Sequence, residues 1–146
     1  MSDIFNSIPS PFRVKLGLAL EGMAIWHLAL ALITAMFLAL IILSSRGGPD
    51  NDTGDAAAMS GLAAIVVGSG ALIVAITFVC ASFVLLKRPF RRSDLSLVLG
   101  PGLVGTAVTI PASIIGWPTS EAVGAWAAFV LISRRLDKRS GASPRL

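Results

Sequence analysis

The sequence consists of long apolar runs separated by short polar or basic segments. The first run covers residues 24–43 and contains one ionisable residue, His27. An α-helix rises about 1.5 Å per residue, so a run of this length matches the roughly 30 Å hydrocarbon core of a bilayer. The pattern therefore predicts a first membrane-spanning helix. Residues 1–23 before it are expected to be cytoplasmic, and residues 44–60, rich in aspartate and glycine, to form a polar non-cytoplasmic loop.

A secretory signal peptide is the alternative reading of this first run, because the basic residues Arg13 and Lys15 precede it. The run is much longer than the apolar part of a signal peptide, and it ends in Leu43-Ser44-Ser45-Arg46 without a small-residue cleavage site. We therefore expect an anchor that is not cleaved.

Two further uncharged runs predict the second and third membrane helices. The second covers residues 61–86 and is stopped by a basic loop, residues 87–94, that begins with four basic residues around a Pro-Phe pair. The third covers residues 95–116 and contains Pro101 and Pro111. Membrane helices tolerate such prolines when neighbouring groups satisfy the carbonyls that proline leaves free.

The fourth apolar run is too short to cross a bilayer by itself. It reaches a spanning length only if the helix starts at Pro118 and continues to Leu136, with the charged ends of Arg134 and Arg135 extending to the interface. The predicted segments are a short turn (residues 117–121), a fourth helix (residues 122–136) and a basic cytoplasmic tail (residues 137–146).

Basic residues fall almost entirely on one side of this four-helix arrangement. The amino-terminal segment holds two, the loop between the second and third helices four, and the region after Ser133 five, whereas Arg46 alone lies on the opposite side. Lysine and arginine are in excess in cytoplasmic segments. The chain is therefore predicted to be an all-α integral membrane protein, a four-transmembrane-helix bundle with both ends in the cytoplasm.

The composition excludes most soluble classes of protein. Hydrophobic residues make up 55% of the 146 residues and charged residues 14%, and the mean hydropathy is +0.83. A soluble domain of this size could not bury so much apolar surface. The formal net charge of +4 does not indicate a nucleic-acid partner, since the basic residues lie in short blocks between apolar runs. Cys80 is the only cysteine, so no intrachain disulfide or cysteine-based metal site is expected.

Small residues on the second and third helices predict where helices pack closely. On the second helix they recur every seven residues, a repeat typical of left-handed helix crossings. Small side chains let helix backbones approach in a membrane. We expect these two helices, joined by a short loop, to pack antiparallel along the two stripes; the alternative is that alanine and glycine are simply abundant. The stripe residues are Gly61, Gly68, Ala75 and Ser82 on the second helix and Gly102, Gly105, Thr109 and Gly116 on the third.

His27 is the candidate functional residue. It lies on an alanine stripe of the first helix, which should face protein, and an ionisable residue inside a membrane is by default a functional group. We therefore consider a proton-linked or ligand-contacting role, since histidine titrates near neutral pH. The alternative is a hydrogen bond to a backbone carbonyl or a lipid headgroup beside Trp26, an interfacial anchor. Glu21 and Arg13 fall on nearly the same face, so Glu21 is expected to be an interfacial acid with a partner.

The sequence carries no catalytic motif. It lacks GxSxG, HExxH and a phosphate-binding glycine loop, and one histidine cannot ligate a haem from both sides. We therefore expect no enzyme activity, no metal and no cofactor. The packing stripes favour a non-catalytic accessory or assembly subunit of a membrane complex, with the lipid bilayer and a homo-oligomer or larger complex as partners.

The alternative function is a small oligomeric transporter or channel that uses His27 and the proline-broken third helix. A transporter needs charged or polar groups near the middle of the membrane. Besides His27, the predicted helices offer only hydroxyl groups there, such as those of Thr77 and Thr106, which weakens this alternative. Arginine outnumbers lysine nine to three, and alanine and glycine are frequent, a bias that points to a bacterial inner membrane.

Overall fold

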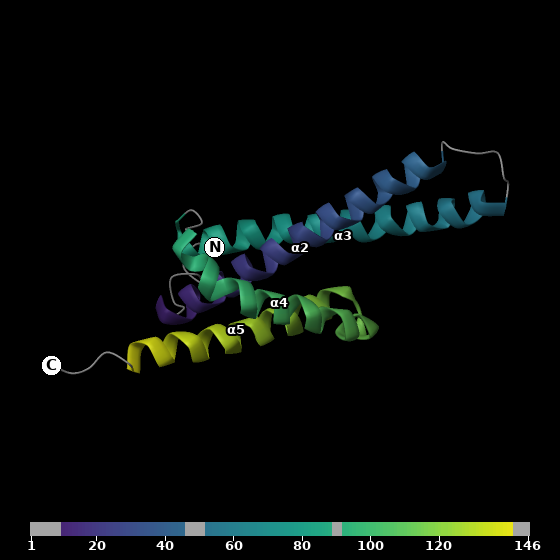
Figure 1. Ribbon diagram of the computed structural model, residues 1–146. Coiled ribbons are helices and arrows are strands. Elements are labelled where there is room, and N and C mark those ends of the chain that lie inside the picture. Colours follow the sequence, from purple (N-terminus) through teal and green to yellow (C-terminus); the bar gives the residue numbers. More distant parts are fainter. Residues whose placement is uncertain (1–9, 46–51, 89–91, 142–146) are drawn as a thin grey trace.

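The computed structural model describes residues 10–45, 52–88 and 92–141. All regular elements in these ranges are helical, and Figure 1 shows them as two antiparallel hairpins that lie against each other. The elements are α2 (Ser10–Ser45), α3 (Asp52–Leu86), the 3₁₀ turn η1 (Arg92–Asp94), α4 (Leu95–Ala112), the 3₁₀ turn η2 (Ser113–Ile115) and α5 (Trp117–Gly141). The prediction of an all-helical chain with four helices is confirmed.

Three helical segments of the described residues are long and apolar enough to cross a membrane. They are Pro11–Ser44, Ala57–Leu86 and Arg92–Ala112. α5 is not one of them, because its apolar stretch is short and basic residues, Lys138 and Arg139, occupy its last turn.

The helices extend beyond the apolar runs that predict them. α2 begins at Ser10 instead of residue 24, and α5 begins at Trp117 instead of residue 122. Hydropathy marks only the part of a helix that suits lipid, whereas backbone hydrogen bonding continues through polar residues of adequate helix propensity. In both α2 and α5 a proline follows the first residue, where its fixed φ favours the helix and its missing N–H is not needed.

The other helices are arranged around α2. It packs along α3 on one side and against α4 and α5 on another, while α4 and α5 pack on each other. α3 has no comparable interface with α4 or α5. The buried core lies where α2, α4 and α5 meet and is made of Leu18, Ala19, Met23, Leu97, Val98, Ala128 and Ile132.

The predicted pairing of the second helix with the third is wrong, because the small-residue stripe of α3 faces α2. A Cβ added at Gly68 would lie 2.6 Å from Thr34 Oγ1, and one at Gly61 would touch a leucine of α2. Ala75 and Ser82, further along the stripe, are also buried. The spacing of small residues predicts which face packs but not against which neighbour, because any backbone that comes close can fill the space.

The stripe on α4 packs on α2 and α5, with the backbones nearly in contact. A Cβ added at Gly102 would lie 2.7 Å from Gly22 Cα, and one at Gly105 would lie 2.8 Å from Gly124 O. Thr109 continues this face and is buried. Space alone therefore requires glycine at these two crossing points.

α4 ends before the third apolar run does. Pro111 stands one residue before its end, the chain tightens into η2, and Gly116 then turns it with a φ of 115°. Positive φ favours glycine, and a Cβ added at Gly116 would meet nothing within 4 Å. Gly116, predicted on the packing stripe of the third helix, is therefore the turn residue between α4 and α5.

Side chains of neighbouring helices bond to the backbone of α4 around Pro101. Proline has no N–H, so it leaves the carbonyl of Leu97 without its helical donor. Arg135 of α5 supplies a substitute, with Nη1 3.3 Å from Leu97 O. In the same turn, Trp26 Nε1 of α2 donates to Leu99 O at 2.8 Å. The carbonyl that Pro101 leaves free is thus satisfied from α5, and the bond from Trp26 ties α2 to the same turn of α4.

Gly102→Ala should destabilise the fold, because the added methyl group would overlap the Gly22 backbone, which cannot move aside as a side chain can. We expect the free energy of unfolding in detergent to fall by about 1–3 kcal/mol, the usual cost of overpacking. Gly70→Ala is the matched control, since a methyl group there would have no neighbour within 4 Å. Equal stability of the two variants would contradict the close contact of α2 and α4.

Candidate functional site

A histidine and a glutamate from different helices meet between α2 and α5. His27 of α2 is 4% exposed, and its Nε2 lies 3.4 Å from Glu121 Oε1 of α5. Its Nδ1 lies 2.9 Å from the carbonyl oxygen of Met23, one turn earlier on α2. Both nitrogens of the buried imidazole therefore have an oxygen partner from the protein.

The two contacts of His27 together require one shared proton. The Met23 carbonyl can only accept, so Nδ1 carries a hydrogen and donates. Nε2 of a neutral imidazole is then an acceptor, and an ionised carboxylate is an acceptor as well. A favourable contact needs a proton on Nε2, giving an imidazolium beside a carboxylate, or on Glu121, giving a neutral acid. The pair is therefore a proton-holding unit.

Apolar groups surround the pair on the side of α3. The ring of His27 meets Phe78 edge-on, with ring centroids 5.7 Å apart. A cavity of about 190 Å³ lies between α3 and the start of α5, lined by Glu121, Trp117, Thr77 and Phe78 among others. In the part of the chain that the structure describes, Glu121 Oε2 is buried and has no hydrogen-bond partner. The cavity is open space beside Glu121 from which water or a proton can reach the pair.

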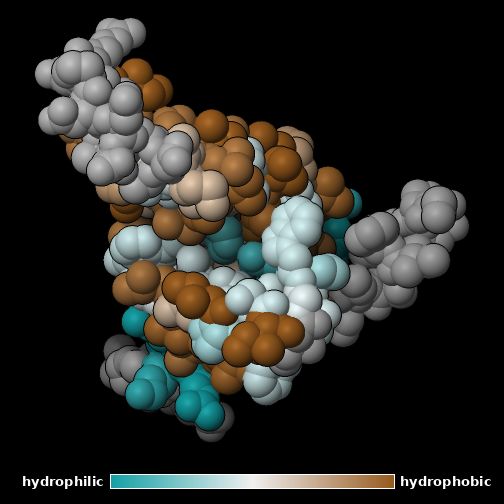
Figure 2. Space-filling view, turned by 90° about the vertical axis from the view of Figure 1, so that its right-hand side faces the viewer, coloured by the Kyte–Doolittle hydropathy of each residue, from teal (hydrophilic) through white to brown (hydrophobic). Residues whose placement is uncertain are grey.

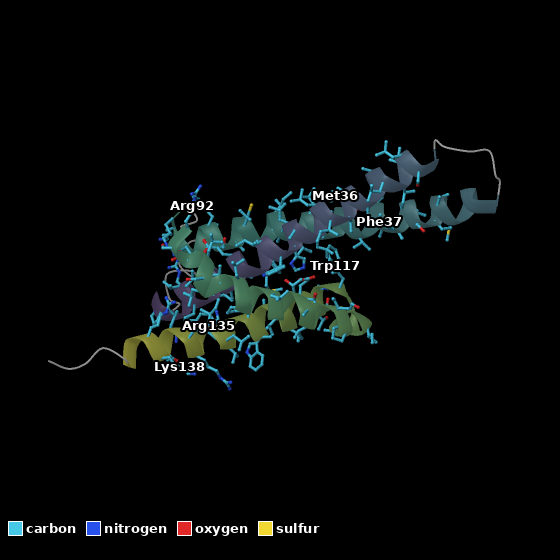
Figure 3. All side chains as sticks on the ribbon, viewed as in Figure 1. Met36, Phe37, Arg92, Trp117, Arg135 and Lys138 are labelled. Carbon is cyan, nitrogen blue, oxygen red and sulfur yellow. The ribbon has the colours of Figure 1, made fainter. Side chains whose placement is uncertain are left out.

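The cavity lies where the shorter hairpin ends beside the longer one. Figure 1 shows that α2 and α3 extend past the turn between α4 and α5. Figure 2 looks onto this end of the molecule and shows hydrophilic and pale atoms between the apolar surface of the α2–α3 hairpin and the turn. In Figure 3, Trp117 lies between the two hairpins at this place. The His27–Glu121 pair is therefore close to the recess between the two hairpins, whose lining is mostly apolar.

Glu121 is the functional candidate that the sequence analysis misses. The hydropathy pattern places it in the turn 117–121, outside every predicted span, whereas α5 begins at Trp117 and includes it. A signal is present, because Pro118 is typical of the first turn of a helix and an acid three residues later belongs to that helix. Hydropathy alone gives no reason to bring this acid towards His27.

A second buried acid, Glu21, lines a groove between α2 and α3. It is 7% exposed, and its Oε2 is a buried atom to which none of the described residues offers a hydrogen bond. Among the described residues, the expected partner Arg13 forms no ion pair with it. Arg88 and Asp94 are paired with each other, with Nη2 and Oδ2 2.6 Å apart. Their opposite charges both interact electrostatically with Glu21.

Basic residues gather at one end of the molecule, around the starts of α2 and α4 and the end of α5. Figure 3 shows Arg92, Arg135 and Lys138 at this end. Lys15 Nζ lies 3.0 Å from Asp137 Oδ1, so the start of α2 is tied to the end of α5. Segments that the sequence assigns to one side of a membrane are thus close together in space.

Comparisons of the chain with models of protein families, with curated proteins and with solved structures find no match. Within residues 10–45, 52–88 and 92–141, no three histidine, cysteine, aspartate or glutamate side chains are grouped so that they could hold a metal ion. The His27–Glu121 pair is therefore the main indication of function in the described part of the chain.

The His27–Glu121 pair should show strong coupling in a double-mutant cycle. His27→Leu leaves the mostly buried Glu121 without its partner. The loss of one member of a fully buried pair typically costs about 3–5 kcal/mol, and we expect a cost near the lower end because Glu121 is partly exposed. We expect the double replacement by leucine to cost less than the sum of the single changes, by at least about 1 kcal/mol. The free energy of unfolding in detergent measures each term. Additive costs would show that the two side chains do not interact.

Proposed function

We propose that this chain is a multi-pass membrane protein with four spans and both ends in the cytoplasm, and that it works as a small proton-linked transporter in an oligomer. The observation that carries the proposal is the contact of His27 with Glu121 between two helices, with 5% and 16% of the two side chains exposed. The hydrogen-bonding chemistry of this contact requires one shared proton. Ionisable groups inside membrane proteins are costly and mark proton relays and substrate paths.

The arrangement of the helices supports a fourth span beside the three apolar ones. α5 runs antiparallel to α4 and returns to the basic end, where Lys15 meets Asp137. A bilayer that covers α4 also covers the part of α5 beside it. Because cytoplasmic segments carry excess lysine and arginine, we assign the basic end to the cytoplasm. The excess of arginine over lysine and the many alanine and glycine residues lead us to assign the protein to a bacterial inner membrane.

The His27–Glu121 pair is assigned to the hydrocarbon region of the bilayer. The part of α2 after Glu21, residues 22–43, contains His27 as its one ionisable residue and is about 33 Å long at 1.5 Å per residue, close to a hydrocarbon core of about 30 Å. His27 lies six residues, or about 9 Å, beyond Glu21 along the helix axis. The pair therefore lies inside the hydrocarbon region, in its cytoplasmic half.

The His27–Glu121 pair favours the transporter over the docking subunit, the two roles that the sequence leaves open. Without a charged partner for His27, the sequence favours a docking subunit over a transporter. Glu121 provides that partner, and the acid also lines a cavity beside the turn of α4 and α5. An oligomer is part of the proposal because four helices, one of them packed on a single neighbour, are too few to enclose a transport path.

The docking role keeps support from a different feature, the outer faces of α3. This helix packs on α2, and large apolar side chains on its other faces are exposed. A face of this kind suits lipid or the helix of a partner subunit. A subunit that docks through α3 needs no titrating pair. Removal of the His27–Glu121 pair should therefore abolish proton transport but not docking. The exposed side chains include Leu62, Ile65, Val66, Ile76 and Phe83.

The proposed orientation predicts the side on which each segment lies. Reporter fusions at the amino terminus, in the loop 87–94 and in the tail 137–146 should all report the cytoplasm, and a fusion near Asp52 should report the opposite side. Each position is tested with two reporters, one active only in the cytoplasm and one active only outside it, so that poor expression is not read as orientation. A cytoplasmic signal near Asp52 would overturn the topology.

Proton flux through sealed vesicles should depend on the pair. In vesicles that contain the purified protein and a pH-sensitive dye, a potassium gradient with valinomycin sets the membrane potential that drives protons. We expect His27→Gln and Glu121→Gln each to lower the flux to the level of empty vesicles, because glutamine cannot exchange a proton. Glutamine keeps the size and hydrogen-bonding reach of the site, so both variants should still fold and assemble.

Thr77→Val is the matched control for the flux measurement. Thr77 lines the same cavity, but its hydroxyl donates to the Ile73 carbonyl and not to the pair. This variant should keep the flux of the parent protein. Absence of proton flux in the folded parent protein would contradict the transport role, and docking through α3 would then be the favoured role. Flux that survives both glutamine substitutions would show that protons move without the pair.

A further inference from the structure

The groove between α2 and α3 that contains Glu21 is separate from the His27–Glu121 pair. Its volume is about 390 Å³, within the usual range of ligand pockets. Most of its wall is apolar and comes from both helices, with Leu28 and Leu72 among the lining residues. Glu21 and Arg88 line it as well, and Arg88 follows the end of α3 at the basic end of the molecule. The groove is therefore amphipathic along its length.

Two charged side chains in this groove each have an atom without a partner. Glu21 Oε2 is a buried acceptor and Arg88 Nη1 is a buried donor, and neither makes a hydrogen bond to the described residues. Arg88 uses its other terminal nitrogen, Nη2, to bind Asp94 Oδ2 at 2.6 Å. Buried polar atoms are nearly always satisfied, so each of these atoms points to a group that the protein does not supply.

The open acceptor and the open donor call for opposite charges in one ligand. Asp94 pairs with Arg88, and among the described residues no basic side chain forms an ion pair with Glu21, so an ammonium group that donates to Oε2 would stabilise the ionised form of this acid. Arg88 Nη1 suits a phosphate oxygen, because guanidinium groups bind phosphate strongly and directionally. The apolar wall along Leu28 and Leu72 would then be covered by a hydrocarbon chain.

We propose that this groove binds one ethanolamine phospholipid from the cytoplasmic leaflet. The ammonium group donates to Glu21 Oε2, the phosphate accepts from Arg88 Nη1, and one acyl chain lies between α2 and α3. The choice of leaflet rests on the proposed orientation, which brings Arg88 to the cytoplasmic headgroups. The lipid preference itself does not depend on proton transport.

Cys80, the one cysteine of the chain, lines the groove and is exposed, so its alkylation by a maleimide reports occupancy. The full chain in lipid-depleted detergent micelles is titrated with phosphatidylethanolamine, phosphatidylcholine or phosphatidylglycerol of the same acyl chains. Phosphatidylcholine has no N–H to donate, and phosphatidylglycerol has no cation. Phosphatidylethanolamine should therefore protect Cys80 at a concentration about tenfold lower than either, the factor expected for one charge-assisted hydrogen bond.

Substitutions in the groove should change this protection in two different ways. Glu21→Gln is expected to make the three lipids protect Cys80 at similar concentrations, because it removes the acceptor of the ammonium group. Arg88→Gln is expected to raise the concentration that each of the three lipids needs, because all three carry a phosphate, and to keep the preference for phosphatidylethanolamine. Glu121→Gln and Arg92→Gln are the matched controls, since they make the same changes at positions that do not line the groove. Unfolding temperatures show whether each variant is folded, and the comparison of three lipids on the unchanged protein tests the proposal without any variant.

Three results would overturn the proposal. Phosphatidylglycerol that protects as well as phosphatidylethanolamine, through Arg88 alone, would show a site for acidic lipids. Protection by tetraphenylphosphonium that depends on Glu21 alone would show a site for lipophilic cations. Equal protection by all three phospholipids would show that the groove is covered by unselected lipid. None of these measurements uses a proton gradient, so failure of the flux experiment and failure of the lipid preference are distinguishable.

Discussion

Backbone contact between α2 and α4 is the constraint on which the rest of the structure depends. Gly22 and Gly102 bring these helices so close that no side chain fits between them, and Gly105 does the same for α4 and α5. Because α4 takes part in both crossings, glycine sets the distance between α2 and α5 more than large side chains do. The imidazole and the carboxylate of the buried pair can meet only because that distance is short.

Hydropathy predicts the number of helices and the three segments of membrane length, because a stretch that suits lipid must satisfy its backbone internally. Hydropathy does not predict the helix ends. α2 begins at Ser10 and α5 at Trp117, both outside the apolar runs, where the backbone can also bond to water. It also does not predict which helices pair. Gly68 of α3 faces Thr34 of α2, and the spacing of small residues contains no information about that partner.

The candidate site is visible in the sequence only in part. His27 stands out because it is an ionisable residue in an apolar run. Glu121 does not stand out, because it follows a polar stretch and approaches α2 only through the return of α5 along α4. Helix spacing likewise suggests Arg13 as the partner of Glu21, whereas the fold brings Arg88 to the same groove. The partner of a buried charge is a long-range property, which the periodicity of one helix cannot report.

In the proposed membrane setting, the unequal length of the two hairpins would make the protein responsive to membrane thickness. Because α2 and α3 reach past the turn of α4 and α5 (Figure 1), they tilt strongly in a thin bilayer, and the turn then stands close to the outer surface. In a thicker bilayer they stand more upright, and the turn lies deeper below the headgroups. Water then has a longer way to Glu121. In the proposed membrane setting, the acyl-chain length of the surrounding lipids thus regulates how readily the buried pair exchanges its proton.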